Sequence, residues 1–97
     1  MKCVLEIVDE NQDISPSLCL KFFTRWEVYS DHVGRQKSYH VLGITDRPIS
    51  EIVSMGESMS DFFLQHFGIV LKRTDLPAFK CEGGMFLPPE ICKADWE

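Results

Sequence analysis

The sequence SMSDFFLQHFG, residues 58–68, carries the clearest structural signal in this chain. Ser58 followed by Asp61 is typical of a helix N-terminus, because the serine side chain accepts a hydrogen bond from a free backbone N–H of the first turn. Gly68 stands where a left-handed C-terminal cap belongs. The large side chains between these ends recur every three or four residues, and they are Met59, Phe62, Phe63, His66 and Phe67. This spacing predicts one helix of about nine or ten residues.

Segments rich in β-branched and aromatic residues lie on both sides of this helix and predict strands. The predicted strands are residues 2–8, 24–29, 37–44, 69–72, 78–82 and 85–88, with a weaker strand signal at 49–55. Turn residues around Gly34 and at Gly83-Gly84 predict two hairpins. The sequence TDRP at 45–48 is expected to end the strand before it. Residues 74–77 and 88–93 are expected to form turns.

A second helix start is marked by Ser15 and Pro16, although the short segment that follows fits either two helical turns or an extended chain. Strands and helices do not alternate along the sequence, which disfavours a doubly wound parallel sheet. A length of 97 residues suits one domain. We therefore predict a single domain, residues 1–97, that is mainly β with some α: a small, partly closed barrel with an inserted helix–hairpin unit.

The composition, with 44% hydrophobic and 26% charged residues, excludes a disordered tail, a collagen-like segment and a coiled coil. No apolar run is long enough to span a bilayer, and the start MKCVLEIVDE does not fit a signal peptide. We therefore expect a soluble, intracellular domain with no membrane partner. Ten Lys and Arg against fifteen Asp and Glu give a net charge of −5. This charge argues against broad binding to duplex DNA, but leaves room for a small basic pocket that captures a strand end.

No motif for catalysis or metal binding is present in the sequence. The four cysteines form no C-x-x-C pair, and no histidine stands at zinc-ligand spacing from Cys3, Cys19, Cys81 or Cys92. Reduced, buried thiols and no cofactor are therefore expected. A G-x-S-x-G elbow and a glycine-rich phosphate loop are also missing, so a small hydrolase has no support. We predict a binding domain and no catalytic residues.

Aromatic and basic residues interleave in two places. Arg35 and Lys37 precede Tyr39 and His40, and the helix at 58–68 carries several aromatic rings together with His66. One interpretation places the rings of Tyr39 and the helix in the core. The other places some of them in a cleft, because one short helix holds more large side chains than a small core absorbs. Such a cleft suits a nucleotide end, since aromatic rings stack bases and cations hold phosphate.

Three pieces of this sequence resemble the PAZ domain of Argonaute, Piwi and Dicer proteins: YHVLGITDRP at 39–48, SMSDFFLQHFGIVLKRTDLPAF at 58–79 and MFLPPEIC at 85–92. The N-terminal third, CVLEIVD and LKFFTRWEVYS, fits more loosely. The resemblance implies a barrel related to the OB and SH3-like folds, with the helix and hairpin inserted. It also implies that a cleft grips the 3′ end of a single-stranded RNA or the two-nucleotide overhang of a small-RNA duplex, with no metal and no reaction.

The resemblance assigns site residues by position. Tyr39 occupies the strand tyrosine, with Lys37 and His40 at flanking positions that are often basic. Phe62 and Phe67 occupy helix positions that are often tyrosine, and His66 a position that is often basic. On the closing hairpin the matching residues are Met85, Phe86 and Leu87, with Leu87 against the terminal sugar. His32 or Ser30 falls near the hairpin histidine of the family.

Several features depart from the family pattern. Phe62 and Phe67 lack hydroxyls that donate to phosphate, and each lost charge-assisted hydrogen bond costs about 1.5–3 kcal/mol. A histidine, His66, stands where a lysine would carry a permanent charge, and residues 49–55 hold no aromatic partner. Two functions follow: RNA 3′-end binding as one module of a larger silencing protein, or a PAZ-like protein-interaction module whose RNA binding is weak or lost. Acidic residues near the termini accompany the second possibility; they are Asp9, Glu10, Asp13, Asp95 and Glu97. A cytoplasmic location, or a nuclear one, is expected for either.

Overall fold

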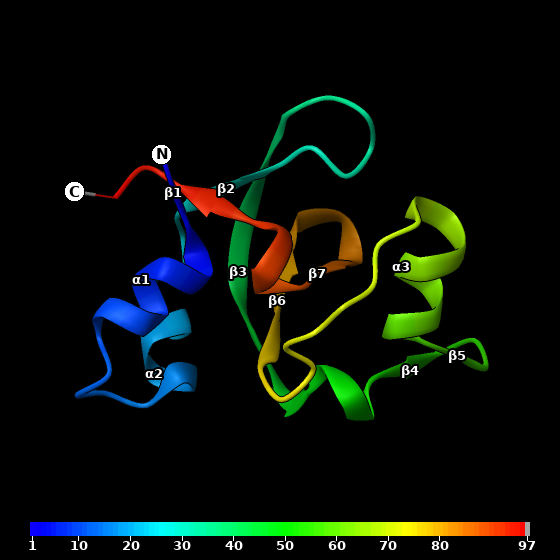
Figure 1. The fold of residues 1–97 in the computed structure, drawn as a ribbon, viewed down its shortest axis with the longest axis horizontal. Coiled ribbons are helices and arrows are strands. Elements are labelled where there is room, and N and C mark those ends of the chain that lie inside the picture. The colour runs from blue at the N-terminus through cyan, green and yellow to red at the C-terminus, as the bar shows by residue number, and fades with distance from the viewer. Residues whose placement is uncertain (97) are drawn as a thin grey trace.

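An antiparallel six-stranded sheet, in the order β1-β8-β2-β3-β6-β7, is the frame of the computed structural model, which describes residues 1–96 (Figure 1). Its strands are β1 (Lys2–Cys3), β2 (Glu27–Ser30), β3 (Lys37–Pro48), β6 (Pro77–Cys81), β7 (Met85–Leu87) and β8 (Lys93–Ala94). A separate hairpin pairs β4 (Val53–Ser54) with β5 (Glu57–Ser58). The α-helices are α1 (Val4–Glu10), α2 (Pro16–Lys21) and α3 (Met59–Phe67). Three short 3-10 helices are η1 (Ile49–Glu51), η2 (Glu82–Gly84) and η3 (Pro89–Ile91).

The predicted helix at 58–68 is confirmed, with both caps. The Ser58 hydroxyl accepts a hydrogen bond from the backbone N–H of Asp61 at 3.1 Å. Gly68 ends the helix in the left-handed region, with φ of 68°, and its N–H donates to the carbonyl of Leu64. At α2, the Ser15 hydroxyl likewise accepts from the N–H of Leu18. The segment whose conformation the sequence left open is therefore helical from residue 16 to residue 21.

Several strand predictions are wrong. Residues 4–10 form helix α1 instead of a strand, because Val4, Ile7 and Val8 bury one face at spacings of three and four. Residues 69–72 lie in neither helix nor strand. The weak signal at 49–55 resolves into η1 and β4, and the turn expected at 88–93 contains η3 and leads into β8.

The strand expected to stop at residue 44 continues through TDRP to Pro48. Thr45 makes this possible, since its side chain replaces ladder hydrogen bonds where the register shifts. The Thr45 hydroxyl donates to the carbonyl of Arg47 at 2.7 Å and accepts from the backbone N–H of Ala78 at 3.0 Å. Both predicted hairpins are confirmed, as β2–β3 and β6–β7.

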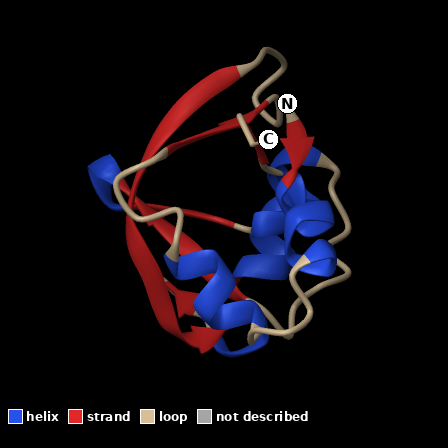
Figure 2. Cartoon of the chain, turned by 90° about the vertical axis from the view of Figure 1, so that its left-hand side faces the viewer, coloured by secondary structure: helices blue, strands red, loops and turns tan. Residues whose placement is uncertain are grey.

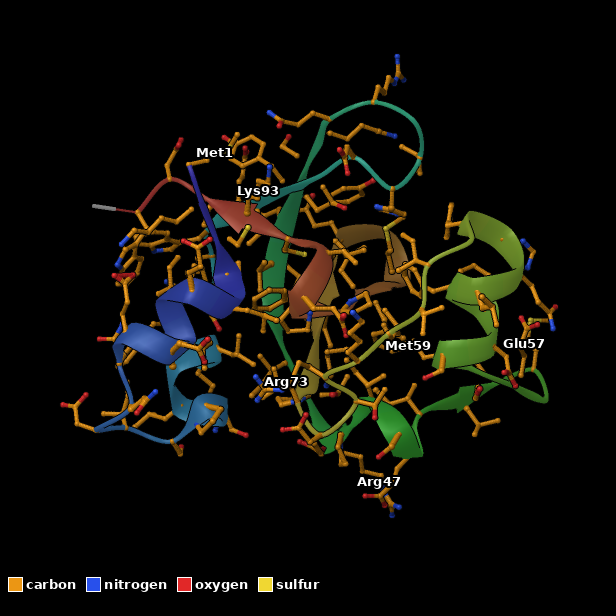
Figure 3. All side chains as sticks on the ribbon, viewed as in Figure 1. Met1, Arg47, Glu57, Met59, Arg73 and Lys93 are labelled. Atoms are coloured by element: carbon orange, nitrogen blue, oxygen red, sulfur yellow. The ribbon has the colours of Figure 1, made fainter. Side chains whose placement is uncertain are left out.

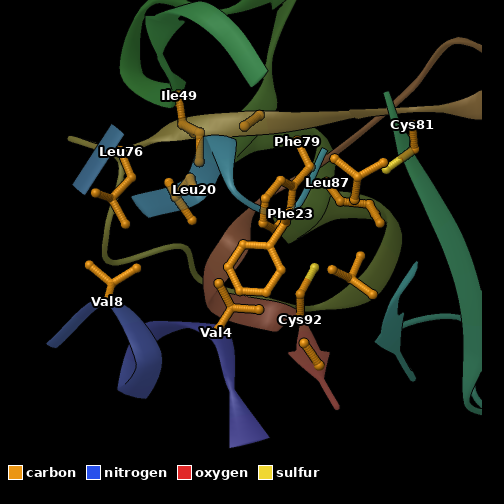
Figure 4. Close-up of a cluster of buried hydrophobic side chains, with 14 of the residues drawn as sticks. Val4, Val8, Leu20, Phe23, Ile49, Leu76, Phe79, Cys81, Leu87 and Cys92 are labelled. Atoms are coloured by element: carbon orange, nitrogen blue, oxygen red, sulfur yellow. The ribbon is translucent and has the colours of Figure 1, made fainter. Parts of the chain in front are cut away.

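The hydrophobic core lies between the sheet and helices α1 and α2, and Figure 2 shows most helices on one side of the long strands. Phe23 and Phe79 are fully buried, with ring centroids 5.7 Å apart. Figure 4 shows these rings among Val4, Leu20 and Leu87. Hairpin β4–β5 and helix α3 form a unit inserted between β3 and β6, at the opposite end of the molecule from α1 and α2 (Figure 1). Among residues 1–96, no helix is long and apolar enough to cross a membrane.

Candidate nucleic-acid interface

An open groove of about 580 Å³ lies where the inserted unit faces strand β7. Helix α3 and hairpin β4–β5 supply one wall, and the turn before β7 with β7 itself supplies the other. Its lining residues are Ile52, Ser54, Met55, Glu57, Met59, Phe62, Phe63, His66, Gly84, Met85 and Phe86. Figure 3 labels Glu57 and Met59 on the inserted unit, far from Met1 and Lys93. The groove is thus built almost entirely from the insertion and the edge strand.

Two phenylalanine rings are exposed on the groove surface. Phe62 and Phe86 are each 39% exposed, whereas Phe63 behind them is nearly buried. The Phe62 ring stacks at a tilt on the His66 imidazole, with centroids 4.4 Å apart, and meets Phe63 edge-on at 5.5 Å. Exposed faces of this kind suit any planar ring, because stacking requires a π surface and no particular hydrogen-bond pattern.

The charges in the groove are few, and the fixed charge is negative. No Lys or Arg is among its lining residues, and Glu57 is its single carboxylate. The Nε2 atom of His66 lies 4.0 Å from a Glu57 carboxylate oxygen. A phosphate deep in the groove would therefore meet a carboxylate instead of a cation. Rings and methionines, not charge, define what this surface can bind.

A second aromatic cluster, formed by His32, Tyr39 and Phe67, lies beside the groove. The His32 ring is 4.8 Å from Phe67 and 5.7 Å from Tyr39, measured between centroids. Phe63 joins this cluster to the groove, at 5.8 Å from His32 and 5.4 Å from Phe67. The cluster therefore ties the β2–β3 loop of the barrel to helix α3 of the inserted unit.

The titratable residues of this cluster are His32 and Tyr39, and both are half-buried. The hydroxyl of Ser30 lies 2.8 Å from Nδ1 of His32. Burial lowers the pKa of His32; the nearby Asp31 carboxylate raises this pKa and the Lys37 ammonium lowers it. Burial also raises the pKa of the Tyr39 hydroxyl. Burial among these aromatic neighbours thus favours the neutral form of His32.

The structure divides the residues that the sequence analysis assigned to one site. Phe62, His66, Met85 and Phe86 line the groove. Tyr39 and Phe67 do not: they are half-buried in the neighbouring cluster with His32. Both interpretations of the aromatic residues are therefore right in part, since some rings pack inside and others line a cleft.

Two assignments require correction. Leu87 is fully buried in the core, so it cannot touch a sugar at the surface. His40 is the cross-strand partner of Glu27 and follows Tyr39 directly, so it points to the opposite face of the sheet. Lys37 shares the face of Tyr39 and is exposed, and Arg35 is exposed in the loop between β2 and β3.

The β4–β5 hairpin contributes groove residues that the sequence analysis missed. Met55 and Gly56 form its two-residue turn, and both have positive φ, 54° and 79°, as a type I′ turn requires. Gly56 is the residue from which this turn could have been predicted, because glycine readily adopts the positive φ that such turns require. The hairpin brings Ser54, Met55 and Glu57 to the groove, and Ile52, directly before the hairpin, lines it as well. The cysteines are free thiols, and residues 1–96 contain no group of three His, Cys, Asp or Glu side chains placed to hold a metal ion.

Comparison with known proteins identifies the fold. No protein-family model matches the sequence, and no curated protein matches it. A solved structure of the Drosophila Argonaute2 PAZ domain, from work on its structure and nucleic-acid binding, aligns with a TM-score of 0.72 and 16% identity over 99% of this chain and 100% of that chain. A second, from work on 3′-end recognition of nucleic acids by the Drosophila Argonaute 2 PAZ domain, has a TM-score of 0.61 and 16% identity over 98% and 81%.

The chain therefore folds as a PAZ-like domain, and the predicted mainly β, OB-like barrel with an inserted unit is confirmed. The groove lies between that inserted unit and β7, the edge strand of the sheet.

Proposed function

We propose that this PAZ-like domain binds the 3′ end of an RNA strand, with the terminal nucleotides in the groove between α3 and β7. A single strand or the two-nucleotide overhang of a small-RNA duplex is the proposed ligand, and the proposed role is binding without catalysis. The observation that carries the proposal is the open, aromatic groove in this fold. The similar Drosophila domain is itself known for 3′-end recognition of nucleic acids.

Stacking supplies most of the affinity in this proposal. Phe62 and Phe86 present exposed rings from the two walls of the groove. Base–aromatic stacking contributes about 1–3 kcal/mol per base. Because the lining has no Lys or Arg, few counterions are released on binding, and affinity should depend only weakly on salt. The phosphates are left to cations outside the groove, including Lys37 beside His32.

The test is fluorescence anisotropy with a short RNA duplex bearing a two-nucleotide 3′ overhang, against the same duplex with blunt ends. We expect tighter binding to the overhang. Phe62→Leu should weaken overhang binding by about 5- to 150-fold, which corresponds to the loss of one stacked base. Leu64→Ala is the matched control, because Leu64 is also exposed on α3 but does not line the groove. Equal, weak binding to both duplexes would count against the proposal.

A protein-interaction module is the second candidate function, and the charge of the groove favours it. The groove is apolar, contains Glu57 and no Lys or Arg, and includes the fully exposed side chain of Met55. Pull-down from lysate with and without nuclease separates the candidates. A protein partner retained after nuclease treatment, together with absent overhang binding in the anisotropy assay, would favour the second function.

In the wider setting of the first proposal, the domain acts in RNA silencing beside other domains of a longer protein. The cytoplasm is the proposed location, with the nucleus as the alternative. Imaging the tagged full-length protein tests the location. Co-purification of small RNAs, lost on Phe62→Leu and kept on Leu64→Ala, tests the role.

A further inference from the structure

A lysine outside the groove lining lies next to one of its aromatic walls. Lys80 on β6 and Phe86 on β7 are direct cross-strand partners in an antiparallel pair. Side chains at such positions lie on the same face of the sheet, with Cβ atoms about 4.5–5.5 Å apart. Phe86 lines the groove, so the Lys80 side chain starts from the strand position next to one of the groove walls.

The surroundings leave the Lys80 side chain available for a ligand. On the neighbouring strand β3, the residue paired with Lys80 is Gly43, which has no side chain. The space that a Cβ at Gly43 would occupy is open, with no atom within 4 Å of that position. Lys80 is exposed, and it takes part in none of the ion pairs formed within residues 1–96. By contrast, Lys2, Arg47 and Arg73 are each occupied by a carboxylate.

We infer that Lys80 binds a backbone phosphate of the RNA strand where it enters the groove across the ring of Phe86. The inference rests on the proposed function and names a contact for it. A ring that stacks a base beside an ammonium that holds its phosphate is a favourable pairing for a single strand. The carboxylate of Glu57 inside the groove disfavours phosphate there, so the path over Lys80, outside the lining, is the less repulsive one.

The experiment measures binding of the two-nucleotide-overhang RNA by anisotropy across a series of salt concentrations, with three variants. Lys80→Met removes the charge, Lys80→Arg keeps it, and Lys93→Met is the matched control. Lys93 is an exposed lysine on β8, three strands from β6 in the sheet and labelled far from the inserted unit in Figure 3. Both Met variants change the net charge by the same amount, so a general electrostatic effect appears in both.

Lys80→Met should weaken binding about two- to fivefold at low salt and reduce the slope of log K against log salt by about 0.7, while Lys93→Met leaves the slope unchanged. Lys80→Arg should restore the slope. A methylphosphonate at the contacted linkage should lower wild-type affinity to the level of Lys80→Met and have no further effect on that variant. If wild-type protein prefers the overhang but Lys80→Met and Lys93→Met behave alike, this inference is overturned and the proposed function stands. If wild-type protein shows no preference for the overhang, the proposed function fails and this inference fails with it.

Discussion

Glu90→Ala is expected to destabilise the domain, because the Glu90 carboxylate holds the segment that joins α3 to β6. Residues 68–76 of this segment form neither helix nor strand. One oxygen of Glu90 accepts hydrogen bonds from the backbone N–H groups of Lys72 and Arg73, both at 2.8 Å. The other oxygen lies 3.1 Å from the same Lys72 nitrogen. These contacts connect η3 to a segment seventeen or eighteen residues earlier in the chain.

The magnitude follows from how exposed each donor is. A hydrogen bond to a charged acceptor contributes about 1.5–3 kcal/mol, but water recovers much of this at an exposed donor. Lys72 is exposed and Arg73 is half-buried, so the loss is dominated by the Arg73 N–H. We expect Glu90→Ala to lower the free energy of unfolding by about 2–3 kcal/mol. For a domain of this size, Tm should fall by about 8–24 °C. Glu90→Gln keeps one acceptor oxygen and should lose less.

Urea unfolding followed by circular dichroism measures this change, with Glu82→Ala as the control. Glu82 is exposed in η2, and its side chain makes no hydrogen bond within residues 1–96. The m-value should stay constant, which shows that the native state changed in stability and not in compactness. If Glu90→Ala unfolds within about 0.5 kcal/mol of the wild type, the carboxylate does not hold the segment and the reasoning fails.

Two further predictions concern titratable groups. Burial lowers the pKa of His32, so below pH 6.5 the unfolded chain binds more protons than the folded one, and stability should fall as pH drops from 7.5 to 5.5. His32→Gln should reduce this fall in the urea midpoint, and an unchanged fall would contradict the assignment. Burial raises the pKa of Cys81 to about 11 and raises the pKa of Cys92 as well, so both should resist iodoacetamide in folded protein at pH 8. Half-exposed Cys3 should be alkylated first, as peptide mapping by mass spectrometry can show; early labelling of Cys81 would contradict this.

The parts of the fold that local chemistry controls were predictable from the sequence. Ser58 and Gly68 cap α3 through contacts within a few residues, so their residue types alone located the helix. Residues 4–10 show the opposite case. Their β-branched side chains favour a strand by propensity, but burying Val4, Ile7 and Val8 on one face selects a helix. Tertiary burial overrode local preference at this position.

Long-range contacts explain the other misses. Thr45 carries β3 past the predicted stop because its hydroxyl bonds the backbone of Ala78, 33 residues away. No local sequence pattern predicts a hydrogen-bond partner at that separation. The same limit applies to the site. The residues of α3 and β7 could be assigned from motifs, whereas Met55 and Glu57 reach the groove only through the folding of β4–β5 against α3.

Under the proposed function, the separation of aromatic surface from positive charge determines how an RNA end would be held. The groove supplies rings without cations, and cations lie outside its lining: Lys37 beside the His32 cluster and Lys80 beside Phe86. Removing a ring at Phe62 should therefore cost more affinity than removing either lysine, since stacking contributes about 1–3 kcal/mol and an exposed ion pair about 0.2–1 kcal/mol. A net charge of −5 does not conflict with this order, because a stacking-led site needs few cations. If removing either lysine instead lowers the affinity more than removing the Phe62 ring, charge and not the groove selects the ligand.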